Sequence, residues 1–139
     1  MAKFKFPKRY DKDVASAGIK FDIHDEFGNH YGRFLTRYLN GNDPKYQLIR
    51  TRLDRTHALA VKTKQMTDDD VFALAFVEYA IIGWEDVFGE DGEPVEFSLE
   101  AAKEYFAEPD AKFVLGQLIS NSVNVEFYQA STPEEAKKK

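Results

Sequence analysis

The chain has 139 residues, of which 31% are charged and none is cysteine, and its net charge is −5 at pH 7. This length fits one domain with a core large enough to fold without covalent staples. The lack of cysteine excludes disulfides, thiolate metal sites and cysteine nucleophiles, and it favours a reducing compartment. No apolar run approaches the ~20 residues that span a bilayer, and the N-terminal residues lack the apolar segment of a secretion signal. We therefore expect a protein of the cytoplasm with no membrane partner.

Charge is divided unevenly along the chain. Residues 1–65 hold 14 Lys and Arg against 7 Asp and Glu, whereas residues 66–139 hold 5 against 17. The two halves can attract each other within one folded chain, or the basic part of one subunit can meet the acidic part of a neighbour in a homo-oligomer. Nucleic acid is not an expected partner, because the whole chain is acidic and its basic half has no Gly-rich or RNP-like aromatic motif.

The first 40 residues are predicted to form β-structure. Residues 1–17 alternate phenylalanine and lysine before Pro7 and are expected to form an arm or a short edge strand. Within residues 18–40, the run GIKFDIH alternates apolar and polar side chains, which is the pattern of a half-buried strand. Turn residues follow at 25–29, and HYGRFLTRYL supplies a returning strand. This segment therefore predicts a β-hairpin.

Residues 44–122 are predicted to be helical. Asp43 and Pro44 are the residue types preferred at the N-cap and the first helical position, and the helix that follows is amphipathic with a basic outer face. Thr67 and Asp70 have the spacing of a capping box. The helix that they begin is apolar on nearly every side, which is typical of a helix at the centre of a core or shared with a partner.

The all-apolar helix is expected to end at Gly83, where Trp84 would fill a corner of the core. Ser98 can cap a third helix, and a short Asp/Pro break precedes a fourth. The predicted fold class is α+β, with an N-terminal β-hairpin, room for a third short strand, and a bundle of about four helices. Residues 1–130 would form one domain, and residues 131–139 a disordered tail because they hold no apolar residue larger than alanine.

No part of the sequence matches a catalytic or metal-binding motif. The acidic turn EDVFGEDGEP does not place glycine and ligands at the positions that an EF-hand requires. His24 and His30 flank the hairpin turn and could face each other, but zinc sites normally have three or four protein ligands. The GxSxG, P-loop and GxGxxG motifs are absent. We expect a protein that is not an enzyme and that binds no cofactor or metal.

Aromatic residues make up 14% of the chain, with 12 Phe and 7 Tyr. Each buried aromatic side chain removes about 150–250 Å² from water, which is more than one small core easily absorbs in total. We therefore expect some of these rings to remain available to a partner or to another copy of the chain.

The second half of the chain resembles a known family. In AFVEYAIIGWEDVFGEDGEPVEFSLEAAKEYFAEPDAKFVLGQLI, a hydrophobic helix ends at Gly83 and Trp84, an acidic D-G-x-P turn follows at residues 91–94, and Ser98 caps a helix that precedes an Asp/Pro break and a terminal helix. This order of features resembles the tail assembly chaperones of long-tailed bacteriophages. The N-terminal hairpin is similar to family members that open on short strands.

The resemblance implies a non-enzymatic protein of the host bacterial cytoplasm, encoded by a phage or a prophage. It implies a chaperone that binds the long helical tape measure protein, keeps it soluble and helps to recruit tail tube subunits. The alternative is a structural phage protein, such as a tail completion or head–tail connector protein.

A chaperone for a long amphipathic helix needs apolar grooves with aromatic anchors that engage the helix reversibly. The exposed edge of the helix over residues 71–82 and nearby aromatic residues are the candidates for such a groove. The basic face of the preceding helix could steer a partner. The predicted partner-binding residues are Arg50, Arg52, Arg55, Phe76, Trp84, Phe88, Phe106 and Phe127.

Overall fold

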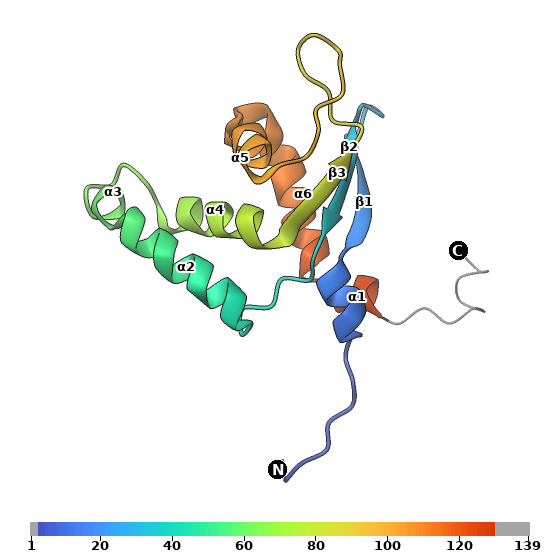
Figure 1. Cartoon of the computed structure of the whole chain (residues 1–139), viewed down its shortest axis with the longest axis vertical. Helices are drawn as coiled ribbons and strands as arrows, with labels where there is room; N and C mark the ends of the chain where they lie inside the picture. Colours follow the sequence, from blue (N-terminus) through green and yellow to red (C-terminus); the bar gives the residue numbers. More distant parts are fainter. Residues whose placement is uncertain (1–2, 130–139) are drawn as a thin grey trace, which may run out of the picture.

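The computed structural model describes residues 3–129 and shows an antiparallel sheet whose one face is covered by helices (Figure 1). The strands are β1 (Ile19–His24), β2 (His30–Thr36) and β3 (Ile81–Glu85). The α-helices are α1 (Lys12–Ala17), α2 (Pro44–Thr56), α3 (Ala58–Lys62), α4 (Asp68–Ala80), α5 (Leu99–Ala107) and α6 (Lys112–Ser122). Two short 3-10 helices, η1 (Pro109–Ala111) and η2 (Val125–Tyr128), flank α6. The α+β prediction is confirmed.

The predicted β-hairpin is formed by β1 and β2, and β3 pairs with the other edge of β2. Phe34 stands at the middle of the sheet, opposite Phe21 on β1 and Trp84 on β3. At the hairpin tip the Asp25 carboxylate accepts hydrogen bonds from two backbone amides, each at 2.9 Å. Gly28 has a φ of +84° there, a conformation that glycine adopts without a steric cost.

The third strand comes from a segment that the sequence pattern assigned to a helix. Helix α4 ends at Ala80, and the chain continues as β3 instead of remaining helical to Gly83. Two successive isoleucines followed by Trp84 favour an extended conformation, and pairing with β2 satisfies their backbone groups. Trp84 is half-buried as expected of a core corner, in contact with the aromatic rings of Phe34, Phe97 and Tyr105.

Residues 1–17 are predicted to form an arm or a short edge strand, and the structure contains an arm followed by a helix. Residues 3–10 have no regular structure, in keeping with an arm, and α1 follows. The Asp11 carboxylate caps α1 by accepting hydrogen bonds from the amides of Asp13 at 2.8 Å and Val14 at 3.1 Å. Gly18, with a φ of +85°, ends the helix. An Asp before and a Gly after this short segment are the sequence signal for α1.

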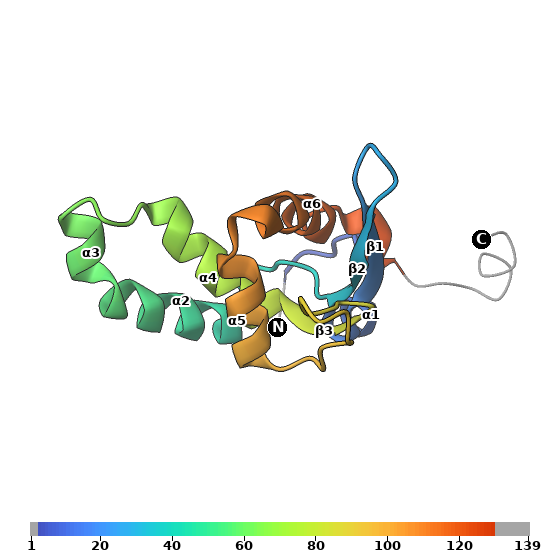
Figure 2. The ribbon, with the colours of Figure 1, turned by 90° about the horizontal axis from the view of Figure 1, so that it is seen from above.

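Helix α4 lies between α2 on one side and α5 and α6 on the other (Figures 1 and 2). Thr67 and Asp70 form the predicted capping box at its start. Val71, Ala75 and Phe76 are at most 1% exposed, so this helix is the centre of the core. The amphipathic helix that the sequence predicts from Pro44 is divided at His57 into α2 and α3, and Ser98 caps α5 as predicted.

The last turn of the described chain packs against the sheet. Tyr128 is fully buried, and its hydroxyl donates a hydrogen bond of 3.0 Å to the Thr36 carbonyl oxygen. The Asp11 amide donates to the Tyr128 carbonyl oxygen at 2.8 Å, which joins the two ends of the fold. The rings of Phe127 and Tyr128 both meet Phe21 edge to face. The tail predicted at residues 131–139 lies outside the described residues.

The start of α2 is tied to the end of α4 by a polar contact. The Tyr79 hydroxyl donates a hydrogen bond of 2.6 Å to one oxygen of Asp43, and the Lys45 amide donates at 2.9 Å to the other. The hydrogen bond from Tyr79, then that from the Lys45 amide, holds the pKa of the Asp43 carboxyl below its ordinary value. Burial, followed by the neighbouring carboxylate, raises the pKa of the Tyr79 hydroxyl.

Replacing Tyr128 with phenylalanine should lower the free energy of unfolding by about 0.5–1.5 kcal/mol, because it removes a buried hydrogen bond and keeps the ring. Urea denaturation measures this change. Tyr105→Phe is the matched control: burial raises the pKa of Tyr105 to about 12, but its hydroxyl has no hydrogen-bond partner within residues 3–129, so a smaller change is expected. An equal loss in both variants would contradict the assignment.

The Asp43 carboxylate should make stability depend on pH. Because its pKa is lowered in the folded chain, its contribution is fully present above about pH 4 and is lost as the pH falls through the folded-state pKa. Asp43→Asn keeps a capping oxygen but removes the titration. The difference in unfolding free energy between wild type and this variant should be constant from pH 7 to 5 and shrink below pH 4. A difference that is unchanged at pH 3 would show that Asp43 is not the titrating group.

Candidate protein-binding surface

The predicted aromatic contact residues are spread over several parts of the structure. Phe76 is fully buried in α4, so it belongs to the core and not to an accessible edge. Phe106 is 9% exposed and Trp84 is half-buried. Phe88 and Phe127 keep 58% and 44% of their surface exposed, on the loop after β3 and on η2. The structure therefore does not gather these residues into one site.

The predicted basic face of α2 is largely engaged within the chain. Arg50 pairs with Asp54 at 3.1 Å and with Asp68, at the start of α4, at 2.7 Å. Arg52 pairs with Glu78 of α4. Two of the three predicted arginines thus hold α2 against α4, and Arg55 is the one with an exposed side chain and no ion pair within residues 3–129.

An apolar groove lies where α4, α5 and α6 converge, with a volume of about 50 Å³. We call it the helix groove. It is lined by Ala73, Leu74, Val77, Lys103, Phe106, Ala107 and Leu115. Because ligand pockets usually enclose about 300–1,000 Å³, this groove has room for the end of one apolar side chain and not for a cofactor.

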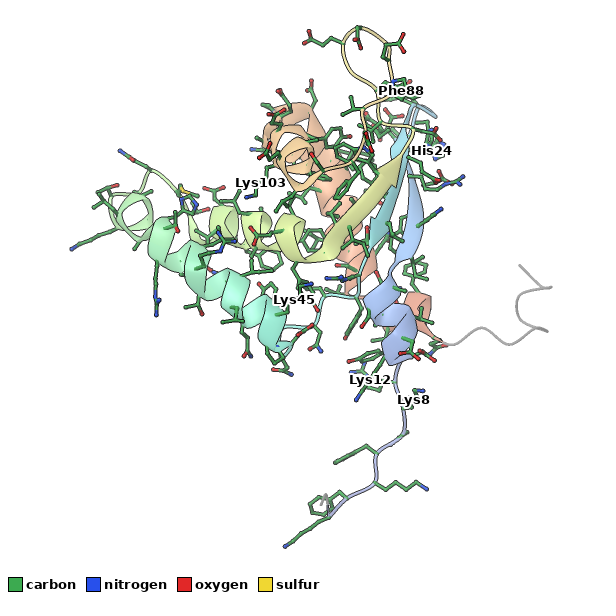
Figure 3. The ribbon with its side chains drawn as sticks, in the orientation of Figure 1. Lys8, Lys12, His24, Lys45, Phe88 and Lys103 are labelled. Carbon is green, nitrogen blue, oxygen red and sulfur yellow. The ribbon has the colours of Figure 1, made fainter. Side chains whose placement is uncertain are left out.

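Small side chains on two of the helices leave the space of the helix groove. Ala73 and Ala107 leave a gap that larger side chains would fill, and Phe106 closes its floor through contacts with Phe34 of the sheet. Lys103 stands beside the groove on α5, and its ammonium group lies 3.7 Å from the Glu78 carboxylate (Figure 3). The groove is therefore an apolar slot with one cation at its side.

A larger concavity is polar. It encloses about 440 Å³ beside α1, the segment between β2 and α2, and the end of α4. We call it the polar cleft. Its lining includes three cationic side chains (Lys12, Arg37 and Lys45), three tyrosines (Tyr10, Tyr38 and Tyr79) and the Asp43 carboxylate.

The loop between β3 and α5, residues 86–97, is exposed and acidic, as the sequence predicts. We call it the acidic loop. Phe88 and Pro94 form an isolated antiparallel bridge that closes its outer part. Glu90, Asp91 and Glu93 are exposed at its tip.

The two hairpin histidines face each other as anticipated, with ring centroids 4.5 Å apart. The His30 ring also lies 3.0 Å from the Asp22 carboxylate, which pairs with Arg33. Within residues 3–129, no three potential metal ligands come together. None of the helices in the same range combines the length and the apolar character that crossing a bilayer needs.

Sequence signals found only part of these features. The sequence predicts the acidic loop, and it names Phe106 and the helix over residues 71–82 as groove candidates, whereas Lys103, Ala107 and Leu115 join them only through the crossing of three helices. The polar cleft brings α1, which only a short sequence signal indicates, together with residues more than 20 positions away in the chain.

Comparison with known proteins identifies the family. Residues 42–139 match the family model described as YdaY prophage protein. No curated protein and no solved structure matches the chain. The matched region covers α2 to α6, and therefore all three helices of the helix groove. The phage origin implied by the resemblance is confirmed: the chain belongs to the YdaY family of prophage proteins.

Proposed function

We propose that this prophage protein is a tail assembly chaperone that binds the tape measure protein, keeps it soluble and helps to recruit tail tube subunits. It acts in the host bacterial cytoplasm by binding and not by catalysis, and it requires no cofactor, nucleic acid or membrane. The observation that supports this proposal is the helix groove, which lies in the segment that resembles tail assembly chaperones.

The helix groove suits a long amphipathic helix. Such a helix presents an apolar side chain at each turn, and a groove can receive these side chains one at a time. A slot of about 50 Å³ accepts a single anchor, so each contact is weak and reversible. Several copies bound along one long partner would keep it soluble without any one copy binding tightly.

Further apolar surface is present on the same helices. Leu99 of α5 and Phe113 of α6 are 39% and 37% exposed. Lys103 is the one cation among the residues that line the helix groove, and its ammonium group pairs with Glu78 of α4. The surface thus offers apolar burial as the source of affinity.

A charge placed in the helix groove should abolish the chaperone activity. Ala107→Glu introduces a carboxylate at an exposed position that lines the groove, and leaving a polar group unpaired in an apolar contact costs about 1–3 kcal/mol. Binding of the tape measure protein of the same prophage should weaken by about 5- to 150-fold. Co-expression followed by separation of soluble and insoluble fractions measures the effect.

The matched control is Ala58→Glu, at the exposed first residue of α3 and outside the helix groove. It should leave the tape measure protein soluble. Equal solubility with both variants would place the binding surface elsewhere. Recovery of the wild-type protein in purified virions would favour the structural alternative, a tail completion or head–tail connector protein.

A further inference from the structure

Opposite charges occupy opposite ends of the molecule. The acidic loop projects at one end of the long axis, and the polar cleft lies toward the other end, between α1 and the start of α2 (Figure 1). Phe88 marks the first end, and Lys12 and Lys45 mark the second (Figure 3). The loop of one chain therefore cannot reach the cleft of the same chain in this fold.

The acidic loop is held in a fixed position. Val87 at its base is 4% exposed, and the Val95 amide donates a hydrogen bond of 2.8 Å to the Val87 carbonyl oxygen. The indole of Trp84 donates at 2.7 Å to the Val95 carbonyl oxygen. Gly32 permits the close approach of Val87, because a Cβ at this glycine would lie 2.9 Å from the Val87 side chain. A loop fixed at its base loses little conformational entropy when it binds.

The tip of the acidic loop carries carboxylates without a counter-charge. Glu90, Asp91 and Glu93 form no ion pair with any basic side chain of residues 3–129. The Gly89 amide donates to the Glu93 carbonyl oxygen at 2.9 Å, so the backbone of the tip is itself closed. Its side chains remain available to a positively charged partner.

The polar cleft carries cations that have no ion-pair partner in the described part of the chain. Lys12, Arg37 and Lys45 form no ion pair within residues 3–129, while Asp43 is the one carboxylate in the lining. Arg37 is held in place by hydrogen bonds to the carbonyl oxygens of Ser16 at 3.0 Å and Tyr79 at 3.4 Å. A volume of about 440 Å³ is within the range that proteins use to enclose bound groups.

We infer that the acidic loop of one copy enters the polar cleft of a second copy, so that the chains associate head to tail. The carboxylates of the tip would meet the three cations, and Phe88 would pack beside Tyr10 and Tyr38, whose ring centroids are 4.6 Å apart. Such a contact is heterologous, so it repeats from copy to copy into a ring or a filament. It rests on the opposite charges, the fixed base of the loop and the volume of the cleft, and it does not depend on the chaperone proposal.

Charge exchange tests this inference. The cleft variant carries Lys12→Glu and Lys45→Glu, and the loop variant carries Glu90→Lys and Glu93→Lys; all four side chains are exposed, so the fold is preserved. Sedimentation of the full chain at low salt should show association of the wild type that decreases at 1 M salt, where the Debye length is about 3 Å. Each variant alone should associate at least about tenfold more weakly, because like charges then face each other.

Reconstitution makes the test specific. A mixture of the two variants should associate again, since the basic loop of one meets the acidic cleft of the other, and a chain with all four changes should also associate. The control Lys62→Glu with Lys64→Glu has the same change in net charge away from the cleft and should behave as the wild type. The inference would be overturned if the wild type stayed monomeric or if the two charge variants associated as strongly as the wild type. It would also be overturned if the Lys62/Lys64 control lost association to the same extent as the variants, or if the mixture of the two variants did not associate.

Discussion

The rest of the structure depends on covering one helix on every side. Helix α4 has no polar face, and its residues Val71, Ala75 and Phe76 are almost completely removed from water. Burial of one such large side chain contributes about 1.5–3 kcal/mol, so exposure of any side of α4 would be costly. Helix α2 covers one side, α5 and α6 cover another, and β3 continues directly from its C-terminal end. The ion pairs between α2 and α4 and the Tyr79–Asp43 hydrogen bond hold α2 against α4.

The same requirement explains where the helix groove lies. Helices α5 and α6, where they meet over α4, leave the narrow helix groove because alanine, and not a larger residue, stands at two of the positions that line it. The core supplies the rigid floor, and the slot supplies apolar surface that a second polypeptide can cover. The charged features lie elsewhere: the acidic loop projects at one end of the molecule, and the polar cleft touches α4 at Tyr79, near the C-terminal end of that helix. The helix groove and the two charged features are therefore separate surfaces.

The sequence predicted the elements that have local signals. Asp43, Thr67 and Ser98 were identified as caps because capping depends on residues within one turn, and the hairpin followed from strict alternation. β3 was missed because Ile81 and Ile82 extend the apolar run of α4, and strand pairing with distant residues decided their conformation. An all-apolar helix has no periodicity that distinguishes an inner from an outer side, so Phe76 was assigned to a surface although it is buried. The helix groove and the polar cleft depend on crossings between distant segments, which no local pattern reports.

The central claim is that the helix groove is the contact surface for a helical partner. Methyl NMR of the full chain, titrated with a soluble helical segment of the tape measure protein, tests it most directly. The account predicts shifts at Leu74, Val77 and Leu115, which line the groove, and little change at the exposed methyl groups of Leu48 and Leu59 on α2 and α3. Shifts at Leu48 and Leu59 with none at the groove residues would contradict it.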